Sequence, residues 1–172
     1  MPHSLYVVAC CSQFEQKRMK RLQILILTMI LTSCASAQTK VTSESFPTNF
    51  SISDFQNLKK LNGDIIAFDG TIKQEKLSRN NTPFYYLEFG KEKGIWTTLM
   101  FKNDKNEIGD QIRVVGYLTK VKDLRPEESY LKGEKFMVIA FGLVDFKTEN
   151  FLFLGGADIQ KKEWIDGKIP TQ

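Results

Sequence analysis

The chain has 172 residues, 42% of them hydrophobic, which is enough to build one globular domain and argues against global disorder. Of its formal net charge of +4, three charges arise near the N-terminus, where Lys17, Arg18, Lys20 and Arg21 face a single acid, Glu15. From residue 38 onward the chain carries 20 basic and 19 acidic residues, which lacks the basic excess of a generic nucleic-acid-binding domain.

The cysteines and the histidine are confined to the N-terminal region. Cys10, Cys11 and Cys34 are the three cysteines, and His3 is the single histidine. A mature chain without this region would have no internal cysteine and no histidine. That composition excludes Cys/His zinc sites, disulfides within the domain, Ser-His-Asp triads and cysteine nucleophiles. We therefore expect no catalytic residues, no metal and no cofactor in the domain.

Residues 19–34 have the pattern of a secretory signal peptide. Lys20 and Arg21 precede the apolar run LQILILTMIL, which is too short for a transmembrane helix, and small residues follow it. Because Met19 begins this pattern cleanly, we expect residues 1–18 to be an over-extended gene start.

The sequence offers two alternative cleavage sites at the end of this leader. Residues 31–34 (LTSC) resemble the bacterial lipobox, in which the cysteine, here Cys34, becomes the lipidated N-terminus of the mature chain. This motif predicts a lipid-anchored protein of the cell envelope, on the periplasmic side or in the outer membrane, with the membrane as a partner. Residues 35–37 (ASA) instead resemble a plain cleavage site, which would release a soluble secreted or periplasmic protein from Gln38. Both place the domain outside the cytoplasm.

The next two segments predict a tether and a short helix. Residues 35–50 are rich in serine and threonine and are expected to form a flexible tether. Residues 51–63 (SISDFQNLKKLNG) predict one helix, with Ser53 as its cap and Gln56 at the capping-box spacing. Asn62 and Gly63 would end it.

From residue 63 the periodicity becomes that of strands. The stretches GDIIAFDGTI (63–72) and GDQIRVVGYL (109–118) both alternate apolar residues, and each places a glycine, Gly70 or Gly116, on the buried face. A glycine there predicts a sharp bend. Two long bent strands favour a small closed barrel over a flat sheet that merely tolerates two glycines.

Five strands are expected, near residues 64–77, 83–90, 95–102, 110–121 and 135–146. Residues 122–134 have the composition of a polar loop, and no sizeable helix fits between the third and fourth strands. Residues 147–172 form a C-terminal extension that is expected to pack on the barrel. Within it, residues 151–154 predict a strand and residues 158–165 a helix that Gly167 stops.

These patterns resemble the OB-fold of the anticodon-binding-like type. GDIIAFDGTI, FYYLEF (84–89) and GDQIRVVGYL stand where that family has its first, second and fourth strands. The resemblance covers residues 63–146 and implies that the domain, residues 51–146, is a mainly β, five-stranded barrel. The chain departs from the family by lacking a helix between strands three and four. Nucleic acid is a partner suggested by this fold alone, because OB-folds serve many ligands.

OB-folds that bind oligomers use the face of strands two and three, flanked by the loops after strands one and four. Alternation predicts that Tyr86 and Trp96 face outward and form an aromatic platform. The candidate ligand face comprises Phe84, Tyr86, Trp96 and Thr98, with Lys73, Arg79, Lys122 and Arg125 at its edges. It would suit bases, saccharides, a protein or an extended peptide. In the alternative, the aromatic residues pack under the N-terminal helix or the tail, and the cations only solubilise the loops.

The sequence thus predicts a binding or interaction module rather than an enzyme. One alternative is a structural protein-contact domain of the envelope without a ligand pocket. Another is a metal-dependent hydrolase. FDG (68–70) resembles part of the DGDT stretch of OB-fold thermonucleases, but the second aspartate and the arginine that the metal chemistry needs are absent. A carboxylate pair from Asp64, Asp69 and Asp110 is also conceivable, although turn chemistry accounts for Asp64 and Asp110.

Overall fold

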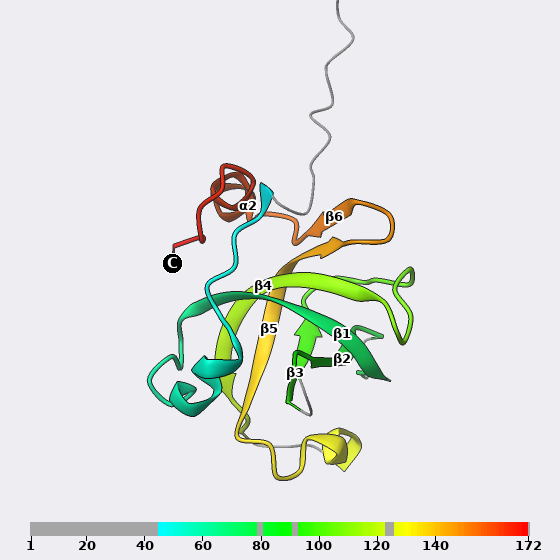
Figure 1. The fold of residues 1–172 in the computed structure, drawn as a ribbon. Helices are drawn as coiled ribbons and strands as arrows, with labels where there is room; N and C mark the ends of the chain where they lie inside the picture. The colour runs from blue at the N-terminus through cyan, green and yellow to red at the C-terminus, as the bar shows by residue number, and fades with distance from the viewer. Residues whose placement is uncertain (1–44, 79–80, 91–92, 123–125, 172) are drawn as a thin grey trace, which may run out of the picture. The chain divides into compact units, whose positions relative to one another are not determined.

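The structure is a computed structural model that describes residues 45–78, 81–90, 93–122 and 126–171. Cys34 and the leader lie outside the described residues, as do Arg79 and Arg125 of the predicted ligand face. The elements, in chain order, are the 3₁₀-helix η2 (Ile52–Asn57), β1 (Ile65–Leu77), β2 (Pro83–Glu88), β3 (Gly94–Leu99), β4 (Gln111–Lys120), the 3₁₀-helix η3 (Pro126–Leu131), β5 (Phe136–Asp145), β6 (Asn150–Phe153) and α2 (Asp158–Ile165) (Figure 1).

The strands close into a barrel. They pair in the order β3-β2-β1-β4-β5-β6, and every pairing in this series is antiparallel. A parallel pairing of β3 with β5, in which Thr97 lies opposite Val138, joins the two sides. The protein is therefore a mainly β, five-stranded mixed closed barrel of the OB-fold type, as the sequence predicts, and β6 extends the sheet beyond β5.

The bends of the barrel lie at or near the two glycines. Opposite Gly116 the β4–β5 register slips, because Val115 pairs with Gly142 and Gly116 with Ala140. In β1 the register slips between Ile72 and Gln74, a few residues beyond the predicted bend at Gly70. Each slip is a β-bulge, which increases the local twist that a small barrel needs.

The main core fills the barrel with inward-facing side chains of the five strands. It includes the fully buried Ile72, Tyr85, Leu87 and Val114. At the end of the barrel where β4 finishes, Phe55, Leu58 and Leu61 pack against this core. The helix that carries Phe55 is a single 3₁₀-helix, and its cap is Ser51 rather than the predicted Ser53. The Ser51 backbone N–H donates to the Asp54 carboxylate at 2.7 Å.

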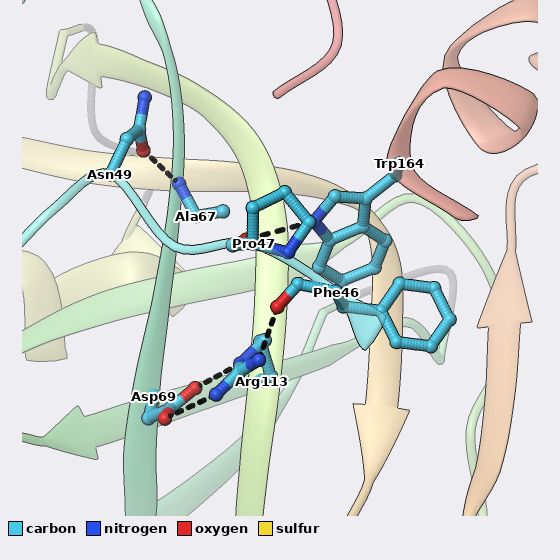
Figure 2. Close-up of polar contacts among 7 residues, drawn as sticks. All are labelled: Phe46, Pro47, Asn49, Ala67, Asp69, Arg113 and Trp164. Carbon is cyan, nitrogen blue, oxygen red and sulfur yellow. Dashed lines mark hydrogen bonds and ion pairs between the residues drawn. The ribbon is translucent and has the colours of Figure 1, made fainter. Parts of the chain in front are cut away.

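The segment before η2, which we call the N-terminal strap (residues 45–50), is packed against β1. It falls within the stretch that the sequence predicts to be a flexible tether, yet Phe46 is 1% exposed and Phe50 is 6% exposed. The Asn49 side chain accepts from the Ala67 N–H at 2.7 Å (Figure 2). It also donates to the Ile65 carbonyl at 3.0 Å. These two bonds imitate the pairing of one more strand residue along β1, so the strap belongs to the domain.

The C-terminal extension contacts the same strap. The indole N–H of the fully buried Trp164 donates to the Pro47 carbonyl at 3.1 Å (Figure 2). Arg113 on β4 donates to the Phe46 carbonyl and pairs with Asp69, whose Oδ2 lies 2.8 Å from its Nη2. The strap, β1, β4, β5, β6 and α2 therefore share a second hydrophobic core.

The predicted elements of this extension are present. The strand forms over Asn150–Phe153 and the helix over Asp158–Ile165. Gly167, with φ of +77°, follows the helix, and its N–H donates to the Trp164 carbonyl at 3.1 Å. Within the described part of the chain, no helix has the length and apolar character needed to cross a bilayer.

Candidate functional site

The outer face of β2 and β3, where the sequence predicts an aromatic platform, is covered by η3. Phe84 is 6% exposed, Trp96 is 4% exposed, and both pack with the buried Leu131. The Tyr130 ring of η3 lies 4.9 Å from the Trp96 ring and 5.6 Å from the Phe84 ring, centroid to centroid. The platform is thus not open to solvent, because η3 buries its apolar surface. The cover comes from the β4–β5 loop, and neither η2 nor the tail provides it.

Two residues of the predicted ligand face remain partly exposed. Tyr86 and Thr98 are both half-buried. The rings of Tyr86 and Trp96 lie together as predicted, 5.4 Å apart, but edge to face with an interplanar angle of 63°. A ligand on this face could reach the Tyr86 edge, whereas Trp96 is covered by η3. The binding role of these residues stays a prediction.

The predicted cations are separated in the structure. Lys73 pairs with Glu88, with its Nζ 3.0 Å from Oε2, so its charge is already compensated. Lys122 is exposed just beyond the end of β4. Arg79 and Arg125 lie outside the described residues. Of the four predicted cations, Lys122 lines a depression in the described surface.

Two adjoining depressions lie at the end of the barrel where β4 finishes and β5 begins. We call them together the lysine hollow. The first, of about 450 Å³, extends from Phe55 and Leu58 to Gly94 and Ile95. The second, of about 520 Å³, lies over Lys120, Val121 and Lys122. Both are lined by Lys59, Glu134, Lys135 and Phe136.

Backbone pairing brings the residues of the lysine hollow together. Lys120 lies opposite Phe136 in the β4–β5 ladder, and the Val121 N–H donates to the Lys135 carbonyl at 3.1 Å. The turn that carries Lys59 is docked on β4, because the Gly63 N–H donates to the Leu118 carbonyl at 2.8 Å. Four separate segments therefore supply the lining: η2 with the turn after it, the start of β3, the end of β4 and the start of β5.

Four lysines give the lysine hollow a positive charge. Lys59, Lys120, Lys122 and Lys135 are all exposed, and none has an acidic partner within 4.0 Å among the described residues. Glu134 is the one acid in the described lining. The four ammonium groups repel one another, and one carboxylate offsets only part of this repulsion. The repulsion is relieved when a negatively charged group binds.

The Tyr86 edge borders the lysine hollow. Gly94 lines the first depression, and a Cβ built on Gly94 would lie 2.6 Å from Cε1 of the Tyr86 ring. Burial raises the pKa of the Tyr86 hydroxyl above its usual value, and the negative charges of Glu134 and Glu88 raise it further. Tyr86 therefore keeps its proton at neutral pH and can donate a hydrogen bond at this border.

Two of the three carboxylates of the hydrolytic alternative, those of Asp69 and Asp110, are engaged in structural contacts. Asp69 is held by Arg113. Asp110 accepts from the Glu107 N–H at 2.9 Å and lies 3.6 Å from the Lys147 Nζ. These contacts lower the pKa of Asp110, chiefly through the backbone hydrogen bond. In the described residues, no group of three or more His, Cys, Asp or Glu side chains is arranged to hold a metal ion.

Sequence reasoning missed three of the four lysines, Lys59, Lys120 and Lys135. The signal that could have found two of them is their position, since Lys120 and Lys135 flank the predicted polar loop at facing strand ends. No comparable signal exists for Lys59, because its approach depends on how the turn after η2 docks on the barrel.

No protein-family model matches the chain, and no curated protein sequence matches it. Solved structures do match, among them a crystal structure described as an aspartyl-tRNA synthetase from Leishmania major Friedlin. That match has a TM-score of 0.45 and 12% sequence identity, and it covers 64% of this chain and 22% of the other. The assignment of an OB-fold barrel rests on the strand pairing itself.

Proposed function

We propose that this protein is a non-enzymatic binding module of the bacterial cell envelope that takes its ligand between the Tyr86 edge and the lysine hollow. One observation carries the proposal: the surface beside Tyr86 continues across Gly94 into an open depression with apolar and charged lining. Ligand sites are typically concave and combine an apolar lining with a few polar groups. A saccharide, a peptide or a segment of another protein would fit this description, and nucleic acid is suggested only by the fold.

The cellular address in this proposal comes from the sequence. The LTSC motif supports lipid attachment at Cys34, with a soluble product beginning at Gln38 as the alternative. A lipidated protein would partition into detergent and carry a mass increment at its N-terminus, and Cys34→Ala would abolish both. An unmodified chain beginning at Gln38, recovered from cells with the native sequence, would contradict the anchor.

Titration of the isotope-labelled full chain tests the binding site. Cell-wall saccharides, extended peptides and single-stranded oligonucleotides are added in turn, and backbone amide shifts are recorded. We expect at least one of these ligands to shift the amides of Gly94, Ile95 and Phe136. Failure of the whole panel to shift them would favour the structural protein-contact domain without a ligand pocket.

A matched pair of variants tests the part played by Tyr86. A hydrogen bond contributes about 0.5–1.5 kcal/mol of net free energy, so the loss of the Tyr86 hydroxyl and ring edge in Tyr86→Ala should weaken the ligand found in the panel roughly two- to tenfold. Tyr117→Ala is the control, because Tyr117 is also a half-buried tyrosine but packs in the second hydrophobic core on β4. Equal losses in the two variants would show that Tyr86 acts through stability rather than through contact.

A further inference from the structure

The lysine hollow has a charge that the domain as a whole does not have. From residue 38 onward basic and acidic residues nearly balance, with 20 of one and 19 of the other, yet four lysines and one glutamate line this depression. Among the described residues, Lys73, Arg113 and Lys147 are each paired with a carboxylate, whereas other exposed lysines, such as Lys105, Lys162 and Lys168, lie outside the lining of the hollow. The lysine hollow differs from these isolated cations because four lysines line one depression with a single acid.

The floor of the lysine hollow is partly apolar. Phe136 packs against the main core and Val121 against the cluster beneath η3, and both are half-buried. Side chains of low polarity beneath the ammonium groups reduce the local dielectric constant, which strengthens their attraction for an anion. A volume of about 520 Å³ lies in the usual range for small-molecule sites.

We infer that the lysine hollow binds a phosphate-bearing group, either the headgroup of an anionic lipid or a soluble phosphorylated compound. This inference rests on the proposed function and names the chemistry of its ligand. Lysine ammonium groups are compact charges that bind phosphate well without the planar geometry that arginine imposes. Lys120, Lys122 and Lys135 lie at facing strand ends and Lys59 lies on the docked turn, so the four lysines border the same hollow from different segments.

Pyrophosphate is the probe for this site. Added to the full chain carrying Cys34→Ala, which removes any contribution from an anchor, it should bind with a dissociation constant of about 1 mM or tighter. The amides of residues 120–122 and 134–136 should shift, and the affinity should fall as salt is raised. The triple variant Lys120→Gln, Lys122→Gln and Lys135→Gln should lose roughly tenfold in affinity, since it removes three ammonium groups that each contribute a modest exposed ion pair.

A second triple variant controls for overall charge. Lys105→Gln, Lys162→Gln and Lys168→Gln removes the same charge from exposed lysines on the β3–β4 loop and the C-terminal extension, and it should bind pyrophosphate as the unmodified domain does. Equal losses in the two triple variants, or no detectable binding of pyrophosphate, would overturn the inference. A ligand that shifts the amides of Gly94 and Ile95 and binds the first triple variant with unchanged affinity would also overturn the inference, while leaving the proposed function intact.

Vesicles distinguish the two sources of phosphate. Binding to phosphatidylcholine vesicles that contain phosphatidylglycerol, but not to phosphatidylcholine alone, would assign a lipid headgroup if the first triple variant abolished it. Binding of pyrophosphate and of glycerol phosphate without vesicle binding would assign a soluble phosphorylated compound. Vesicle binding that persisted in the first triple variant, together with unchanged pyrophosphate affinity, would contradict the site.

Discussion

Substitution of Gly116 by alanine perturbs a close backbone contact between β4 and β5. A Cβ at this position would lie 2.5 Å from the Ala140 Cα and would also strike the Ile139 carbonyl oxygen. Both atoms belong to the backbone of β5, so no side chain can turn away to make room. The clash falls at the bulge where the β4–β5 register slips, which fixes the path of both strands.

The expected cost follows from this geometry. Atoms closer than 3.0 Å to a Cβ must move, and movement of a paired strand resembles the overpacking of a core, which costs typically about 1–3 kcal/mol. We expect Gly116→Ala to fall at the upper end of this range. Gly70→Ala should cost less, because its Cβ would meet only the Leu87 Cβ, at 2.9 Å. Gly94→Ala should also be costly, since Gly94 begins β3 and its Cβ would lie 2.7 Å from the Leu87 carbonyl oxygen.

Urea unfolding followed by circular dichroism measures these differences as free energies of unfolding. Gly155→Ala is the matched control, because nothing lies within 4 Å of its Cβ position and its φ is not positive. The control should stay within about 0.5 kcal/mol of the unmodified protein, as surface substitutions usually do. A Gly116→Ala variant as stable as Gly155→Ala would refute the reasoning about the bulge.

Three further predictions concern the strap, a buried phenol and the tryptophans. Arg113→Met should speed amide hydrogen exchange in residues 45–50, because it removes the donor to the Phe46 carbonyl; unchanged exchange would mean that the strap is held without it. Burial raises the pKa of the Tyr85 hydroxyl, so the stability that it contributes is present below about pH 10, where unfolded tyrosine ionises, and is lost as pH rises above that value. Tyr85→Phe should flatten the alkaline fall of the free energy of unfolding, and an unchanged slope would contradict this cause. Trp96 and Trp164 are both buried, so their fluorescence should be blue-shifted and protected from acrylamide; a red-shifted, quenchable component in a Trp164→Phe variant would show Trp96 uncovered.

The strands were predictable because each depends on local alternation. Ile66 and Phe68 in β1, and Ile112 and Val114 in β4, face the core at the spacing of two that the sequence shows. Gly167 likewise marks the end of the last helix from its local conformation alone. Within three residues at each end, all five barrel strands lie where the periodicity places them.

The strap and η3 were not predictable, because both are stabilised by distant partners. Phe46 and Phe50 stand in a Ser/Thr-rich stretch whose composition indicates a tether, and contacts with residues distant in sequence, on β1, on β4 and at Trp164, order them. Tyr130 and Leu131 stand in a polar loop, yet they cover the outer face of β2 and β3. In each case a pair of apolar residues in a polar segment was the available signal.

The candidate site was predictable only in part, for the same reason. Strand alternation placed Tyr86 and Trp96 together on the outer face, which the structure confirms. Alternation cannot say whether an outer face is covered, and here η3 buries Trp96. The lysine hollow depends on the docking of a turn against two strand ends, so its residues are distant in sequence and carry no shared motif.

Amide chemical-shift mapping with a phosphate-bearing ligand tests the location of the binding surface most directly. The full chain, labelled with ¹⁵N, is titrated with pyrophosphate while every assigned amide is followed. We predict that the largest changes fall on Gly94, Ile95, residues 120–122 and residues 134–136. Largest changes on Thr98 and residues 128–131, over the covered aromatic face, would place the ligand where OB-folds usually bind and would contradict a site in the lysine hollow.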